Sequence, residues 1–304
     1  MRQAVPLDCE KAKALLQSTD TFLFDCDGVL WNGGDVIKDA NAVVNKLQEL
    51  GKKVFLVTNN STKTRDEYVA KCAKLGFNCN EPQVISTSYL TVQYLKSLHF
   101  DKKVYLVGSS GLSREMDAAG IRHLGEGPDV MEGNVFDGRL DHIRLDPEVG
   151  AVVVGFDSHI SFNKILKASS YLKNPDVLFI ATNRDERFPM EHIVCPGTGT
   201  MVTAVAVASG REPTIMGKPS REVFEALRRQ HGLDPARTVM VGDNCKTDIT
   251  MGNVCGLRTL AVLTGVTTRA DLERLVADSA ADGALAPQVP ELVAPQIGDL
   301  LPFL

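Results

Sequence analysis

Short apolar runs of strand length, each closed by turn or polar residues, recur along the whole chain and constrain its fold most strongly. Within each run the apolar residues are continuous and do not alternate with polar ones. This pattern is typical of strands covered on both faces, as in a parallel sheet. The runs predict strands at 21–25, 53–60, 103–108, 151–156, 177–183, 213–218, 238–243 and 259–265.

Helical patterns lie between several of these predicted strands. Residues 39–53 carry apolar side chains at helical spacing and end near Gly51, a stop signal. Residues 220–233 begin with Ser220 as an N-cap and end near Gly232. Strands that alternate with helices predict an α/β fold with a doubly wound parallel sheet.

Length and composition narrow the class of protein. The chain has 304 residues, and at roughly 100–200 residues per domain we expect two domains. A formal net charge of -5 without a long basic run argues against a general nucleic-acid binder. Seven widely spaced cysteines without a C-x-x-C pair argue against a disulfide framework or a structural zinc site.

No run reaches the roughly 18 apolar residues of a membrane helix, and the N-terminus lacks the apolar core of a signal peptide. We therefore expect a cytoplasmic protein without a membrane partner.

Polar side chains follow four of the predicted strands at the point where each strand ends. They are Asp25 and Asp27, then Thr58, Asn59 and Asn60, then Lys218, then Asp243 and Asp248. In an open parallel sheet, ligands bind outside the carboxyl ends of the strands. We therefore expect these side chains to converge on one site.

The acids of this site predict a divalent cation. Asp25, Asp27 and Asp243 together carry about three negative charges, which is costly without a compensating cation. Carboxylates, a backbone carbonyl and waters are the ligands that Mg²⁺ prefers, and no histidine or cysteine is placed to favour zinc or copper. We expect Mg²⁺ and Lys218 to relieve the repulsion.

Such a group of side chains suits phosphoryl transfer. A carboxylate can attack phosphorus and form an aspartyl-phosphate. A second acid two residues away can protonate the leaving oxygen and later deprotonate the attacking water. The metal and the lysine would share the charge on the transferring group, and the Thr58 hydroxyl with nearby N–H groups would hold phosphoryl oxygens.

Four motifs carry a family resemblance. "DCDGVLW", "TNN", "GKP" and "VGDNCKTD" occur in that order and resemble the four motifs of the haloacid dehalogenase (HAD) superfamily of phosphatases. The chain is most similar to the branch that contains phosphoglycolate (glycerol-3-phosphate) phosphatase, chronophin and NagD. That branch inserts an α/β cap between the second and third motifs. The resemblance predicts a core at 1–98 and 208–304, with the cap at 99–207.

The resemblance also implies roles for the site residues. Asp25 is expected to be the nucleophile and Asp27 the general acid and base. The Asp25 and Asp243 carboxylates and the Asp27 backbone carbonyl would ligate Mg²⁺, supported by Asp248 through hydrogen bonds or a water. The residues expected to contact the phosphoryl group are Thr58, Asn59, Asn60 and Lys218. Relatives of this branch often pair through their caps, which suggests a homodimer.

The cap loop at 181–199 predicts the substrate. In relatives with this cap the loop reaches over the active site, and the chronophin loop has a histidine before its proline. Here Arg187 and Phe188 stand before the proline. An arginine suits a small anionic substrate through a bidentate pair. We expect a small phosphorylated metabolite, 2-phosphoglycolate or glycerol 3-phosphate.

Several alternatives stay open at this point. Asp248 could be an ordinary acid at a helix start, and Arg187 could be solvated. Cys26, which alternation aims away from the acids, is better explained as a buried small side chain than as a redox switch. Other functions to weigh are a chronophin-like phosphatase of pyridoxal 5′-phosphate or phosphoproteins, a receiver-like signalling or scaffold protein, and a dehalogenase or mutase.

Overall fold

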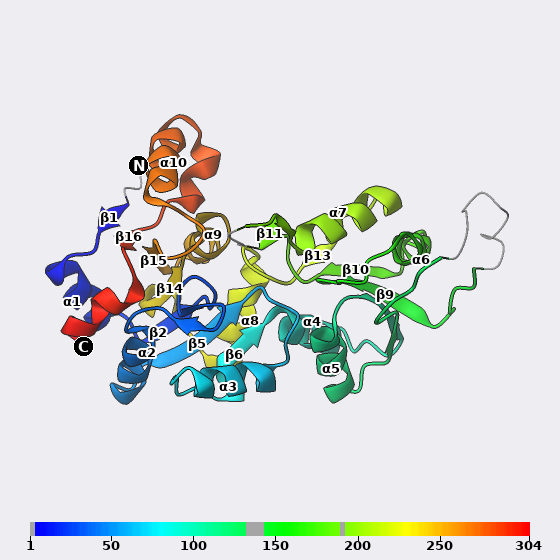
Figure 1. Cartoon of the computed structure of the whole chain (residues 1–304), viewed down its shortest axis with the longest axis horizontal. Coiled ribbons are helices and arrows are strands. Elements are labelled where there is room, and N and C mark those ends of the chain that lie inside the picture. The colour runs from blue at the N-terminus through cyan, green and yellow to red at the C-terminus, as the bar shows by residue number, and fades with distance from the viewer. Residues whose placement is uncertain (1–3, 132–142, 189–191) are drawn as a thin grey trace. The chain divides into compact units, whose positions relative to one another are not determined.

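The chain folds into two compact units, seen in a computed structural model that describes residues 4–131, 143–188 and 192–304. Unit 1 consists of the residues up to Thr58, Arg65–Ile85 and Lys218–Leu304, and unit 2 consists of Asn59–Thr64 and Ser86–Gly217. Both end regions of the chain therefore contribute to unit 1, and its middle forms unit 2 (Figure 1).

Unit 1 contains a seven-stranded sheet with the order β1-β16-β15-β14-β2-β5-β6. The recorded pairs, from β1/β16 through to β2/β5, are parallel. Its strands are β1 (Val5–Pro6), β2 (Thr21–Phe24), β5 (Lys53–Thr58), β6 (Val84–Ser86), β14 (Thr238–Gly242), β15 (Arg258–Val262) and β16 (Leu292–Ala294). A separate antiparallel pair is formed by β3 (Trp31–Asn32) and β4 (Asp35–Val36).

Helices accompany this sheet. They are α1 (Cys9–Ser18), α2 (Ala40–Glu49), α3 (Arg65–Lys74), α8 (Arg221–His231), α9 (Thr250–Val254) and α10 (Arg269–Ala281). Short 3-10 helices occupy Glu81–Gln83, Pro235–Arg237, Gly283–Gln288 and Ile297–Phe303, and a π-helical turn occupies Cys245–Ile249. Ser220 caps α8 by accepting from the Glu222 amide, and Gly232 ends it with φ 61°, as the sequence predicted.

Apolar clusters cover both faces of this sheet. One cluster joins alternate residues of β2, β5, β14, β15 and β16, with Leu260 among them, to side chains from α1, α2 and α3. The opposite face has a second cluster, in which Ala261 of β15 and Val293 of β16 pack with Leu272 of α10. Alternate strand residues thus enter different clusters, which is why the strands are apolar without a break.

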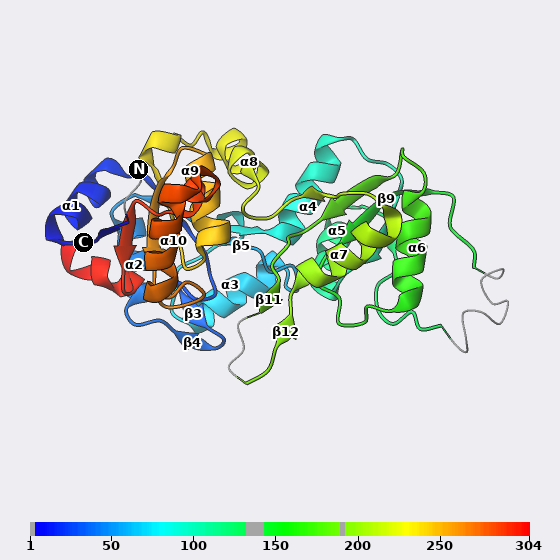
Figure 2. The ribbon, with the colours of Figure 1, turned by 90° about the horizontal axis from the view of Figure 1, so that it is seen from above.

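Unit 2 contains a parallel five-stranded sheet with the order β13-β10-β9-β7-β8. Its strands are β7 (Lys103–Val107), β8 (His123–Leu124), β9 (Val149–Val154), β10 (Leu178–Ala181) and β13 (Thr214–Ile215). Its helices are α4 (Thr87–Ser97), α5 (Ser110–Ala118), α6 (Phe162–Leu172) and α7 (Thr198–Ser209). α6 and α7 lie side by side and bury one apolar cluster with the sheet (Figure 2). The strands β11 (Arg187–Phe188) and β12 (Cys195–Pro196) form an antiparallel pair.

The structure confirms the predicted α/β class with parallel sheets, and it places one predicted strand differently. The run at 213–218 forms a strand only over Thr214–Ile215, and this strand pairs with β10 in the sheet of unit 2. The sequence analysis had assigned the run to the core. Helix α4 likewise groups with unit 2, although it falls within the range 1–98. No helix among the described residues has the length and apolar character needed to cross a membrane.

Candidate active site

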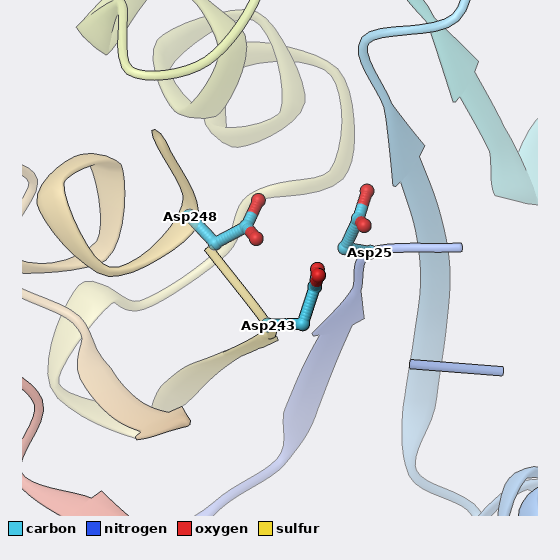
Figure 3. A group of neighbouring side chains, drawn as sticks. All are labelled: Asp25, Asp243 and Asp248. Atoms are coloured by element: carbon cyan, nitrogen blue, oxygen red, sulfur yellow. The ribbon is translucent and has the colours of Figure 1, made fainter. Parts of the chain in front are cut away.

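Three acids lie together at the carboxyl ends of two neighbouring strands. Asp25 directly follows β2 and Asp243 directly follows β14, and Asp248 lies in the π-helical turn that comes next (Figure 3). Each of the three offers a carboxylate oxygen, and these oxygens lie within 4.8 Å of one another. The Asp25 amide donates to the Val241 carbonyl at 2.9 Å and so extends the pairing of the two strands to the site.

Lys218 reaches this group from another direction. Its Nζ lies 2.5 Å from Asp25 Oδ1 and 2.8 Å from Asp248 Oδ1, and it donates to the Val57 carbonyl at 2.8 Å. The predicted convergence of Lys218 with the acids is therefore seen. The expected origin of Lys218 at the end of a core strand is wrong, because the chain arrives from β13, a strand of the sheet in unit 2.

Glycines make the room in which Asp243 sits. A side chain at Gly28, whose φ is +89°, would place its Cβ 2.6 Å from Asp243 Oδ2. Glycine therefore suits position 28 for two reasons: it adopts a positive φ readily, and it leaves space for the Asp243 carboxylate. The Val266 amide donates to Asp243 Oδ2 at 2.6 Å. A backbone amide thus holds one oxygen of the Asp243 carboxylate in place.

Asp248 is positioned by its own turn. Its Oδ2 accepts from the Asn244 amide at 3.1 Å, and its Oδ1 pairs with Lys218. The side chain is only 1% exposed. The sequence assigned Asp248 a supporting role behind the metal ligands, and the geometry adds a direct ligand role as an alternative, because its carboxylate belongs to the same close group.

Burial and mutual repulsion shift the protonation of all three acids. Burial, with the charges of Asp25 and Asp248, raises the pKa of Asp243 to about 8. Burial raises the pKa of Asp248 to about 7, although Lys218 opposes the shift. Burial also raises the pKa of Asp25 against the effect of Lys218. For Lys218, burial acts to lower the pKa, but the charges of Asp248 and Asp25 outweigh it and raise the pKa.

These residues fit a hard divalent cation. Three carboxylates lie beside one buried ammonium, so ionised acids would outnumber the cation by about two charges. Burial, and then the repulsion between the acids, raises the pKa values of Asp243 and Asp248. Oxygen donors without sulfur or imidazole are the set that Mg²⁺ uses. Within the described ranges, no other group of three or more His, Cys, Asp or Glu side chains has this arrangement.

Asp27 has a different environment from Asp25. Its Oδ1 accepts a hydrogen bond from Trp31 Nε1 at 3.0 Å and lies 3.8 Å from Lys71 Nζ. The same ammonium lies 4.3 Å from the centre of the Trp31 ring. The Asp27 side chain is 45% exposed, so solvent reaches its carboxylate. Cys26, between the two acids, is fully buried, as expected for a small core side chain.

Thr58 lies in unit 1, and the two asparagines that follow it belong to unit 2. The Thr58 side chain is buried, with Oγ1 3.5 Å from the Tyr68 hydroxyl. Asn59 Nδ2 donates to Asp185 Oδ2 at 2.8 Å. Asn60 Oδ1 accepts from the Thr62 amide at 2.8 Å. Contact of these three residues with a phosphoryl group stays a prediction. Both asparagine side chains already make hydrogen bonds within unit 2.

Arg187 opens strand β11 in unit 2, and its side chain is exposed. The next residue, Phe188, packs edge-on against Phe156 with ring centres 5.1 Å apart. Residues 189–191 of the predicted loop lie outside the described residues. A substrate-binding role for Arg187 stays a prediction.

Sequence reasoning missed the partners of two site residues. Lys71 beside Asp27 and Asp185 beside Asn59 come from distant parts of the chain, and no local pattern marks them. For Trp31 a signal existed, because a helical or turn spacing of four residues from Asp27 brings the two side chains within reach.

Comparisons with known proteins agree with the motifs. Residues 22–122 match a family model described as haloacid dehalogenase-like hydrolase, and residues 215–300 match a HAD-hydrolase-like model. Glycerol-3-phosphate phosphatase of Gallus gallus is 44% identical over 100% of this chain and 97% of that protein. The chloroplastic phosphoglycolate phosphatase 1A of Arabidopsis thaliana is 40% identical over 87% of this chain and 74% of that protein.

A solved structure shows the same architecture. The p-nitrophenyl phosphatase from Archaeoglobus fulgidus is similar with a TM-score of 0.79 and 29% identity, over 94% of this chain and 99% of that chain. The predicted fold and the resemblance read from the four motifs are thereby confirmed. The chain belongs to the haloacid dehalogenase-like hydrolases, in the family of glycerol-3-phosphate and phosphoglycolate phosphatases, and is a phosphoric monoester hydrolase.

Proposed function

We propose that this protein is a Mg²⁺-dependent phosphatase of small phosphorylated metabolites, with glycerol 3-phosphate and 2-phosphoglycolate as substrates and an aspartyl-phosphate on Asp25 as the intermediate. The observation that carries the proposal is the meeting of Asp25, Asp243 and Asp248 with the Lys218 ammonium at the carboxyl ends of β2 and β14. The names of the relatives with 40–44% identity support these two substrates.

The cation would be held by the carboxylates of Asp25 and Asp243 and the backbone carbonyl of Asp27, with Asp248 as a supporting group or a further ligand. When bound, Mg²⁺ offsets the negative charge of the acids and of the phosphoryl oxygens. Lys218 contributes a second fixed positive charge from within the protein, and its ion pairs with Asp25 and Asp248 hold it in place.

The side chains of the chain divide the reaction between them. Asp25 attacks phosphorus with a carboxylate oxygen, and the bond from phosphorus to the ester oxygen breaks. Asp27 gives its proton to that ester oxygen, so the alcohol leaves neutral. Asp27 then takes a proton from a water, and the water oxygen bonds to phosphorus while the bond from phosphorus to Asp25 breaks. This step releases inorganic phosphate and restores the Asp25 carboxylate. Lys218 stabilises the charge on the phosphoryl oxygens.

Trp31 and Lys71 favour this use of Asp27. The indole N–H donates to one carboxylate oxygen at 3.0 Å, which fixes the orientation of the carboxyl group. Lys71 Nζ, 3.8 Å from the same oxygen, places a positive charge beside the carboxylate. The side chain of Asp27 is 45% exposed, so the water that gives up its proton can reach the carboxylate.

Unit 2 is proposed to act as the cap that selects the substrate. It contains the β11/β12 pair, which is separate from its five-stranded sheet, and Arg187 is the first residue of β11. An exposed guanidinium can bind the carboxylate or hydroxyl groups of a small substrate, and a bidentate pair would favour 2-phosphoglycolate. We further propose that two chains pair through unit 2, which light scattering of the purified protein tests.

A panel of phosphate esters tests the proposal. Glycerol 3-phosphate, 2-phosphoglycolate, pyridoxal 5′-phosphate, p-nitrophenyl phosphate and a phosphopeptide are incubated with the protein in Mg²⁺ and in EDTA, and inorganic phosphate is measured. We expect the highest kcat/KM for the first two and no turnover in EDTA. Preference for pyridoxal 5′-phosphate or the phosphopeptide would contradict the substrate assignment.

The proposed aspartyl-phosphate intermediate can be tested separately. Acid quench of the working enzyme followed by mass spectrometry should find phosphate on the peptide that contains Asp25. An intermediate that persists for minutes to hours without release of phosphate would instead indicate receiver-like signalling. An isomerised ester in place of inorganic phosphate would indicate a mutase.

A further inference from the structure

A hydrogen bond within unit 2 joins two segments that are both expected to border the substrate. Asn59, the residue after Thr58, donates from Nδ2 to Asp185 Oδ2 at 2.8 Å, across 126 positions of sequence. Asp185 follows β10 in the loop that leads to Arg187. The same carboxylate oxygen also accepts a hydrogen bond from Asn183 Nδ2. One carboxylate thus holds two amide side chains.

The backbone around Asp185 is fixed by the start of α7. The Gly199 amide donates to the Asp185 carbonyl at 2.9 Å, and the Gly197 amide donates to the Glu186 carbonyl at 2.9 Å. Neither glycine has room for a side chain, since a Cβ at Gly199 would meet the Arg184 carbonyl oxygen at 2.6 Å. The Asp185 carboxylate is therefore presented to Asn59 from a rigid support.

Asn59 in turn packs against the residue that precedes Lys218. A Cβ at Gly217 would lie 2.6 Å from Asn59 Oδ1, so only glycine permits this close approach. The Thr87 hydroxyl donates to the Asn59 carbonyl at 3.1 Å and completes the support. Asn59 thus adjoins Thr58 along the chain and Gly217 in space, and Gly217 is bonded directly to Lys218.

We infer that Asp185 is a positioning residue for phosphoryl transfer, which acts through Asn59 on the backbone that follows Thr58 and precedes Lys218. The carboxylate only accepts hydrogen bonds, so it fixes the Asn59 amide with its nitrogen toward Asp185 and its oxygen toward Gly217. The structure thereby assigns the Asn59 side chain to holding the backbone after Thr58 and before Lys218 in place. The backbone N–H groups after Thr58 are then left to bind phosphoryl oxygens. The inference rests on the proposed location of the phosphoryl site.

The inference differs from a role in substrate selection, and kinetics separate the two. A residue that acts on the phosphoryl site affects every ester alike, whereas a residue that supports only the loop of Arg187 affects acidic substrates selectively. Asp185→Ala should lower kcat/KM by about 10- to 100-fold for p-nitrophenyl phosphate and for 2-phosphoglycolate alike. Asp185→Asn keeps an acceptor oxygen for Asn59 and should retain most of the activity.

Two further variants make the test specific. The double variant Asn59→Ala with Asp185→Ala should lose no more activity than Asn59→Ala alone, because Asp185 acts through Asn59. Glu212→Ala is the matched control, because the exposed Glu212 pairs with Arg184, the neighbour of Asp185 in this loop. It should keep near wild-type kinetics. Additive losses in the double variant, or losses confined to acidic substrates, would overturn the inference.

A measurement without turnover keeps this test separate from the proposed function. Hydrogen exchange followed by mass spectrometry should show faster exchange at 57–62 and 215–219 in Asp185→Ala than in Glu212→Ala. Unchanged exchange in these segments would overturn the positioning role even if the enzyme is active. Failure of wild-type protein to hydrolyse any ester would instead contradict the proposed function, and leave the exchange result to decide this inference.

Discussion

The ammonium nitrogen of Lys218 lies 2.5 Å from Asp25 Oδ1, although 193 positions separate the two residues along the chain. Asp248 Oδ1 lies 2.8 Å from the same nitrogen. Lys218, Asp25 and Asp248 side chains are 2%, 14% and 1% exposed, so water screens these ion pairs only weakly. These ion pairs stabilise the folded site, and the proposed reaction would use the same ammonium to offset the charge of the phosphoryl oxygens.

Lys218→Met should abolish most activity and also lower stability. Two buried carboxylates lose their cation, and breaking a buried pair by removing one partner costs about 3–5 kcal/mol. We expect at least a hundredfold lower kcat/KM and a lower Tm at neutral pH. Lys13→Met, at an exposed lysine of α1, is the control. Wild-type turnover in Lys218→Met would contradict its role.

Asp25→Asn should stop the release of phosphate and leave the fold intact. The amide is a poor nucleophile, whereas its shape still fits between Lys218 and the strand end, so melting and circular dichroism should remain close to wild type. Phosphate release is measured with p-nitrophenyl phosphate over a long incubation. Turnover within tenfold of wild type would exclude Asp25 as the nucleophile.

Stability should depend on pH and on Mg²⁺ through the acid group. In the folded, metal-free protein the pKa of Asp243 is raised from 3.8 to about 8 and that of Asp248 to about 7. The pH window runs from 3.8 to about 8, the ordinary and the raised pKa of Asp243. Within it the folded state keeps protons that the unfolded state releases. The free energy of unfolding therefore falls as pH rises through this window. A bound cation favours the ionised carboxylates and opposes the fall.

Melting curves across that window check this linkage. In EDTA the Tm should decline from the lower to the upper end of the window, and added Mg²⁺ should raise the Tm most at the upper end. Asp243→Asn should flatten both effects. A Tm gain from Mg²⁺ that is equal at both ends of the window would contradict the linkage.

Trp31→Phe should lower kcat more than it changes KM. The ring and most of its packing remain, but the N–H that donates to Asp27 Oδ1 at 3.0 Å is lost. A hydrogen bond to a charged acceptor is worth about 1.5–3 kcal/mol, which sets an upper limit of roughly a hundredfold. Phe77→Leu, which removes the aromatic contact on Trp31 but keeps the N–H, is the control. Equal losses in the two variants would indicate a packing effect.

Arg187→Ala should raise KM selectively for acidic substrates. The exposed guanidinium is expected to bind the substrate's anionic group, which p-nitrophenyl phosphate lacks. Kinetics with 2-phosphoglycolate and with p-nitrophenyl phosphate are compared in the same preparation. Equal changes for both substrates would argue against a role of Arg187 in specificity.

Long apolar strands could be predicted from sequence, whereas most of the short ones could not. Every predicted run contains a strand, because burial on both faces of a sheet leaves a continuous apolar signal. Strands β1, β8 and β16 have two or three residues and join a sheet only through long-range pairing. Strand β13 was predicted, but its membership in the sheet of unit 2 depends on pairing with β10, which no local pattern reveals.

The candidate site shows the same division. Asp25, Asp243 and the GKP lysine could be identified from their motifs, since each motif is short and contiguous in sequence. The hydrogen bond of Asn59 to Asp185 and the contact of Lys71 with Asp27 could not, because each joins segments that only folding brings together.

By itself, the sequence determined the chemistry of this protein: which acids end the strands, that a lysine accompanies them, and that parallel strands alternate with helices. These features depend on local apolar patterns and on motifs within a few residues. Only the tertiary structure decided which carboxylate oxygens the ammonium groups of Lys218 and Lys71 contact. It also decided which side chains hold Asn59 and Asp27 in place. Those choices depend on distances of a few ångströms between distant segments, and packing sets such distances after the strands have formed.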